Sequence, residues 1–188
     1  MRSTRVFPLL LLLLAGILSF AAKQAESGIY EIKDGSVYFK SDAPLELIEA
    51  RSSKLKGLID VEKQTFAFSV PSESFEGFNS ALQREHFNEN YIESDKYPKS
   101  TFSGKIIEKI NLSKDGEYVV RAKGKLTIHG IEQERIIRST ITVKKGAVSI
   151  HSAFTVLLQE HNITIPRVVH QKIAEEISVE INAVAIKR

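Results

Sequence analysis

Apolar residues alternate with polar ones along most of the chain from Ile29 onward, and this period of two is the feature that most constrains the fold. In the clearest stretch, Tyr118 to Ile128, every second residue is apolar or glycine and most residues between them are charged or polar. Side chains of a β-strand point alternately to opposite faces, so the pattern predicts a strand with one buried and one solvated face. Gly130, just beyond it, is suited to a tight turn.

Related patterns, separated by turn residues, predict about eight strands along the chain. They cover Tyr30 to Lys40, Leu45 to Leu58, Phe66 to Val70, Thr101 to Ile110, Tyr118 to Ile128, Ile131 to Lys144, Val148 to Leu158 and Ile177 to Ile186. Two segments, Asn79 to Tyr91 and Pro166 to Glu176, space their apolar residues at nearly helical intervals and are predicted to be short helices. Many short antiparallel strands form either a sandwich or a barrel, and periodicity alone does not distinguish the two.

The first residues have the pattern of an export signal. Arg2 and Arg5 precede an uncharged, largely apolar stretch that ends at Ser19-Phe20-Ala21, a small-residue cleavage site. We predict a signal peptide over residues 1–21 and a mature domain over residues 22–188, which places the protein in the periplasm or outside the cell. An uncleaved stretch of this length would instead anchor the protein in a membrane.

Composition excludes several classes of protein. The sequence contains no cysteine, which rules out disulfides, thiol chemistry and lipid attachment through cysteine. Two of the 26 basic residues lie in the signal, so the rest of the chain is almost balanced against 23 acidic residues. Nucleic acid is therefore not an expected partner, since it requires a concentrated basic face.

No arrangement of residues predicts a metal site or an active site. The five histidines, residues 86, 129, 151, 161 and 170, lack the spacings typical of metal ligands. The sequence also lacks a nucleophile elbow and a glycine-rich phosphate loop. We expect neither metal nor cofactor and predict that the protein is not an enzyme, while a hydrolase with an unrecognised site remains an alternative.

Two motifs resemble those of the YceI-like family. The first is the segment from His86 to Phe102, which contains Asp95-Lys-Tyr-Pro98, and the second is Gly124-Lys-Leu-Thr-Ile-His-Gly130. In that family a short helix leads through a "D-x-x-Y-P-x-x-x-F" turn into a strand, and the next strand ends in a "G-x-L-T-I-H-G" hairpin. The resemblance spans about residues 29 to 186. It implies an all-β, antiparallel, eight-stranded lipocalin-like barrel with one or two short helices.

The resemblance further implies that an apolar tube inside the barrel binds a long-chain lipid, typically an isoprenoid, for transport or storage in the cell envelope. Transient membrane contact and a homodimer are compatible with this function. The residues predicted to line the tube are Phe66, Phe68, Phe87, Tyr91, Phe102, Val120, Leu126, Ile128, Ile141, Ile150, Phe154 and Val156. The alternative is a surface or stress-response barrel whose core is filled and holds no lipid.

One segment and three single residues leave their roles open from sequence alone. The segment from Phe87 to Ile92 is either a plug that closes one end of the core or a gate through which a ligand enters. Arg135, near the predicted hairpin, is one candidate for contact with a lipid head group. Asn162 and Glu132 replace residues that are usually glycine and threonine in the family, so neither position is assigned a family role.

Overall fold

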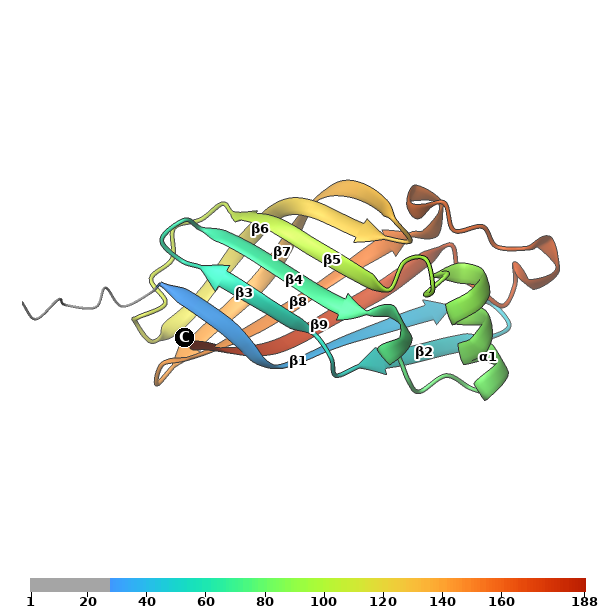
Figure 1. The fold of residues 1–188 in the computed structure, drawn as a ribbon, viewed down its shortest axis with the longest axis horizontal. Coiled ribbons are helices and arrows are strands. Elements are labelled where there is room, and N and C mark those ends of the chain that lie inside the picture. The colour runs from blue at the N-terminus through green and yellow to red at the C-terminus, as the bar shows by residue number, and fades with distance from the viewer. Residues whose placement is uncertain (1–27) are drawn as a thin grey trace, which may run out of the picture.

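The computed structural model describes residues 28–188, which form an antiparallel β-barrel with one short α-helix (Figure 1). The predicted signal peptide lies outside the described residues. The nine strands are β1 (Ile29–Asp42), β2 (Leu47–Ser52), β3 (Lys56–Asp60), β4 (Thr65–Pro71), β5 (Lys99–Ile106), β6 (Gly116–Ile128), β7 (Ile131–Lys144), β8 (Ala147–Leu157) and β9 (Glu176–Lys187). The helical segments are η1 (Ser72–Ser74), α1 (Ala81–His86), η2 (Phe87–Tyr91), η3 (Leu158–His161) and η4 (Arg167–Val169).

Each strand pairs with its neighbours in the order β2-β1-β3-β4-β5-β6-β7-β8-β9, and pairing of β1 with β9 closes the sheet. The first residues of β1 pair with β3, and the second half of β1 pairs with β2. Closure leaves eight strands around the barrel with β2 as an extra strand. The pairing of β1 with β9 confirms the predicted barrel. A closed sheet has far fewer unpaired strand edges than an open one.

Two predicted elements are wrong. The stretch from Leu45 to Leu58 is not one strand but two, because the chain turns where the Ser52 hydroxyl accepts a hydrogen bond from the Lys54 amide at 3.1 Å. The stretch from Pro166 to Glu176 contains only the short η4 and an irregular loop before β9 begins at Glu176. Its apolar residues follow a helical interval because several of them face the barrel interior, and Ile177 already belongs to β9.

The two ends of the barrel differ. One end, here called the closed end, carries the β3–β4 and β7–β8 turns and the C-terminus, while the other, the mouth, carries α1 and the long β8–β9 connection (Figure 1). Near the closed end the inward side chains pack into a dense core. It includes the buried residues Tyr30, Ile32, Ile59, Phe66, Ile106, Leu112, Val120, Ile141, Val143, Val148, Ile150 and Ala185.

Glycines allow two strands to approach closely in this core. Gly104 on β5 is the register partner of Gly124 on β6, and a Cβ atom at Gly104 would lie 2.1 Å from the Lys123 carbonyl oxygen. No larger residue fits there without moving the backbone. At Gly124, the first glycine of the "G-x-L-T-I-H-G" motif, a Cβ atom would likewise lie 2.3 Å from the Ser103 carbonyl oxygen, so this glycine permits close packing of the two backbones, as the structural interpretation of the sequence expected.

Candidate functional site

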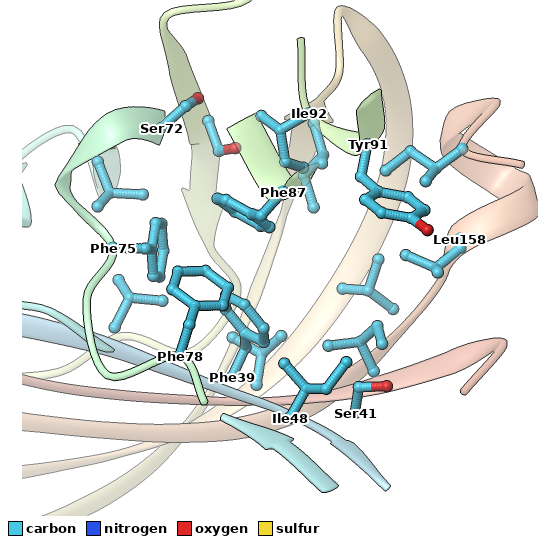
Figure 2. A pocket seen from close by; sticks show the side chains of 18 of the residues that line it. Phe39, Ser41, Ile48, Ser72, Phe75, Phe78, Phe87, Tyr91, Ile92 and Leu158 are labelled. Atoms are coloured by element: carbon cyan, nitrogen blue, oxygen red, sulfur yellow. The ribbon is translucent and has the colours of Figure 1, made fainter. Parts of the chain in front are cut away.

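The half of the barrel nearest the mouth contains a cavity of about 460 Å³. Its walls are mainly apolar side chains from the strands, from α1 and η2, and from the β8–β9 connection (Figure 2). This volume and this lining are typical of sites that bind small organic ligands. The cavity stops where the dense core of the closed end begins.

Eight of the twelve residues predicted to line the tube do line this cavity. They are Phe68, Phe87, Tyr91, Phe102, Leu126, Ile128, Phe154 and Val156. The structure places the other four, Phe66, Val120, Ile141 and Ile150, in the packed core of the closed end, with Val120 only 1% exposed. All twelve face inward, but the period of a strand gives the face of a residue and not its depth along the barrel. Which of them contact a ligand stays a prediction.

An aromatic cluster beneath α1 was missed by the sequence interpretation. The ring of Phe87 stacks on Phe39 with centroids 5.4 Å apart, and it also contacts Phe75 at 5.8 Å and Phe78 at 5.1 Å. Figure 2 shows these four rings facing one another at the edge of the cavity. Phe75 and Phe78 belong to the connection between β4 and α1, where no strand period marks an inward side chain. On β1, Phe39 lies on the same face as Val37 and Ser41, two residues away on either side. Its inward direction could therefore have been predicted from the strand period.

We call α1 and η2 together the lid. Helix α1 begins after Ser80, whose side chain accepts a hydrogen bond from the Gln83 amide at 3.1 Å. The Gln83 side chain donates to the Glu46 carboxylate at 2.9 Å, which ties the lid to the β1–β2 turn. No residue of α1 or η2 is fully buried. The lid is therefore attached to the barrel mainly through Phe87 and a few hydrogen bonds.

The β8–β9 connection forms the opposite side of the mouth. Leu158, Ile163, Val169 and Ile173 from this connection line the cavity. Its end is held to the β1–β2 region by two hydrogen bonds, from the Leu45 amide to the Gln171 carbonyl at 2.9 Å and from the Ala174 amide to the Ser41 hydroxyl at 2.9 Å. The mouth thus lies between two segments that are fixed to the same turn.

Among the polar side chains of the lining, several are serines or threonines, and Glu46, Gln83, His86 and Lys172 carry carboxylate, amide, imidazole and ammonium groups. Arg135 does not reach the cavity. Its guanidinium donates to the Glu160 carboxylate at 2.8 Å and to the Thr155 carbonyl at 2.7 Å, so it serves the structure of the barrel wall and not a ligand head group. Lys172 is the only lysine or arginine among the lining residues of the described chain.

The two sequence motifs meet beside the mouth. One nitrogen of His129 lies 2.7 Å from the Glu93 carboxylate and the other lies 2.9 Å from the His161 carbonyl oxygen. The hydrogen bond from Lys96, and to a smaller extent the one from His129, hold the pKa of Glu93 below its ordinary value. Both ring nitrogens of His129 are thus engaged with fixed acceptors, so the geometry gives this histidine a structural role.

His161 is buried inside the same junction. Its Nδ1 lies 3.1 Å from the Ile131 carbonyl oxygen, to which it donates, while Nε2 is buried without a hydrogen-bond partner. Burial lowers the pKa of His161 below its ordinary value, since a second proton would leave a charged, unpaired N–H away from water. Asn162, which follows it, has φ of 55°, a left-handed conformation that asparagine tolerates better than most residues. This explains how asparagine replaces the usual glycine.

Within residues 28–188 no group of three or more histidine or acidic side chains is placed to bind a metal ion. In the same part of the chain, no helix has the length and apolar character needed to cross a membrane.

A family model for the YceI-like domain matches residues 33–185. The chain belongs to the YceI-like family. No curated protein matches it with significant similarity. Among solved structures, the fold is similar to a polyisoprenoid-binding domain from Saccharophagus degradans implicated in plant cell wall breakdown, with TM-score 0.71 and 11% identity over 85% of this chain and 98% of that one.

Two other solved structures share the YceI-like fold. BcnA of Burkholderia cenocepacia has TM-score 0.66 and 16% identity, over 80% of this chain and 95% of that one. The YceI protein of Campylobacter jejuni has TM-score 0.55 and 17% identity, over 85% of this chain and 84% of that one. At such low identities these likenesses show the fold alone.

Proposed function

We propose that this YceI-like protein binds a long-chain lipid of the isoprenoid class in the cavity, without catalysing a reaction, and carries or stores it in the cell envelope. The observation that carries the proposal is the division of the barrel into a packed closed end and a cavity of about 460 Å³ with an apolar lining at the mouth. The polyisoprenoid-binding neighbour and the family membership support the same ligand class.

The energetics favour exchange and not permanent capture. Burying one five-carbon isoprene unit contributes about 4 kcal/mol, at about 0.8 kcal/mol per carbon. A bilayer provides most of the same gain, so the lipid partitions between protein and membrane with a small difference in free energy. Such a balance suits a carrier or a reservoir that makes transient contact with membranes.

Lipid extraction tests the proposal directly. The full chain, expressed in a bacterial host so that its own signal directs it, is purified without detergent and its organic extract is analysed by mass spectrometry. We expect a long-chain lipid in stoichiometric amount, and a delipidated sample should take up farnesol. A parent protein that yields no lipid and takes up no farnesol would contradict the proposal. Static light scattering on the same sample will distinguish a monomeric carrier from a homodimer.

A further inference from the structure

The tip of the β8–β9 connection extends beyond the ends of the strands at the mouth (Figure 1). Here Val168 is 89% exposed, more than any other large apolar residue among the described positions. Two further exposed apolar side chains, Leu45 at 66% and Leu82 at 58%, belong to the β1–β2 turn and to α1, the other segments that form the mouth. Each of the three segments that form the mouth thus carries an exposed apolar side chain, and the one at the tip is the most exposed.

The middle of the connection carries two cations. From His161 to Ala174 the chain contains Arg167 and Lys172 and no acidic residue, while Glu160 and Glu175 lie at the two ends of the connection and Glu160 pairs with Arg135 at 2.8 Å. Arg167 and Lys172 are exposed, and neither forms an ion pair with any residue in the described part of the chain. A solvated apolar tip flanked by free cations is complementary to a surface that is apolar inside and negatively charged outside.

The tip is also continuous with the cavity. Val169, Lys172 and Ile173 line the cavity while Val168 points into solvent, so the same short segment faces a ligand and the exterior. A lipid that leaves the cavity past this segment emerges beside the exposed tip. The occupant of this surface is therefore expected to be the source or the acceptor of the lipid.

We propose that the segment from His161 to Ala174, which we call the docking loop, places the mouth on an anionic lipid bilayer by inserting Val168 between head groups while Arg167 and Lys172 contact phosphates. The inference rests on the proposed function and adds to it the membrane surface on which lipid is exchanged. One inserted valine and two cations give weak, reversible binding, as a shuttle requires. A partner protein fits less well, since stable protein interfaces bury about 800 Å² on each side and one loop tip offers much less.

Vesicle co-sedimentation tests the docking loop with the purified full protein. Vesicles are made of phosphatidylcholine alone or of phosphatidylcholine mixed with phosphatidylglycerol. We expect binding to the mixed vesicles, little binding to the neutral ones, and loss of most binding in Val168→Asp. The matched control is Val119→Asp, an exposed valine on β6 near the closed end, which should bind like the parent. Equal binding by Val168→Asp and the parent, or equal loss in both variants, would overturn the proposal.

The cations are tested separately with the double variant Arg167→Gln/Lys172→Gln. Each cation near an anionic surface contributes about fivefold to binding, so the double variant should bind the mixed vesicles about 25-fold more weakly. Unchanged binding at low ionic strength would contradict the electrostatic part of the docking.

Farnesol offered from solution distinguishes failure of docking from failure of carriage. Val168→Asp should still take up farnesol from solution but should take it from vesicles much more slowly than the parent. Farnesol uptake by a parent that binds no vesicles would overturn the docking proposal and leave lipid binding standing. Vesicle binding by a parent that takes up no farnesol would support the docking surface and contradict carriage.

Discussion

The ring of Tyr97 lies edge-on against the imidazole of His129, with centroids 4.8 Å apart and ring planes at 75°. The contact joins the Asp95-Lys-Tyr-Pro98 turn to the "T-I-H-G" hairpin, the two motifs that are separate in sequence. His129 and Gly130 form the two-residue hairpin loop with φ of 51° and 71°, the conformation of a type I′ turn. The Tyr97 ring also covers Gly130, where a Cβ atom would lie 2.3 Å from its Cε1 atom.

The first prediction concerns Gly130. Gly130→Ala should lower the free energy of unfolding by more than 2 kcal/mol, because alanine in the left-handed region costs about 1 to 2 kcal/mol and the added methyl also collides with Tyr97. Gly146, in the β7–β8 turn, has φ of 79° and no atom within 4 Å of its Cβ position. Gly146→Ala should therefore show only the backbone cost. Equal losses in urea denaturation would show that the Tyr97 contact contributes nothing.

The second prediction separates the cavity from the packed core by two valine-to-phenylalanine changes. Val120 is buried at the closed end, so Val120→Phe should overpack the core and destabilise the protein by about 1 to 3 kcal/mol. Val179, the register partner of Phe154, lines the cavity, so Val179→Phe should fold normally and bind less lipid. Denaturant stability and lipid per protein are measured for both. Unchanged lipid content in Val179→Phe would place the ligand elsewhere.

The third prediction distinguishes a plug from a gate at Phe87. Because the lid contains no fully buried residue, we expect Phe87→Ala to speed farnesol uptake and to cost much less than the roughly 3 to 5 kcal/mol of a core Phe→Ala change. The control is Phe66→Ala at the closed end, which should show the full core cost. A loss for Phe87→Ala as large as that control, with no change in uptake rate, would make the lid a plug.

The fourth prediction follows from His161. Its folded-state pKa lies below the ordinary 6.5, so in acid the unfolded chain binds a proton that the folded one does not. The stability that depends on neutral His161 is present above about pH 6.5 and is lost as the pH falls, by at most about 1.4 kcal/mol per pH unit. His161→Gln should flatten the loss as the pH falls below about 6.5, whereas His170→Gln, an exposed control, should not. Identical pH profiles in both variants would contradict the prediction.

The fifth prediction concerns export. Intact-mass analysis of protein recovered from the envelope or periplasm should give a chain that begins at or near Ala22. A protein still carrying Arg2 and Arg5, recovered with membranes, would indicate an anchored form.

The sequence predicted the barrel better than it predicted the site. Strict alternation identified the inward face of β6 and the turn at Gly130 correctly, because both depend on local geometry. The break between β2 and β3 depends on a serine hydroxyl, and no glycine or proline marks it. The cavity depends on which inward residues reach across the barrel and which are covered by the lid. The depth of an inward residue along the barrel depends on the register of all strands together. Phe66 and Phe68 therefore looked equivalent in sequence, although only Phe68 lines the cavity.

Phe66 and Phe102, whose ring centroids lie 4.8 Å apart with the ring planes tilted by 49°, mark the boundary between the core and the cavity. This boundary is the floor of the tube and limits the length of chain that the cavity holds. Inward side chains follow one another every second residue, about 6.6 to 6.8 Å apart along a strand, so each strand offers separate positions at which a side chain can form the floor. A guest longer than the tube must keep its remaining carbons outside the mouth. Selection among homologous lipids would therefore change by discrete lengths as residues at the floor are exchanged, while the strands that carry them stay in place.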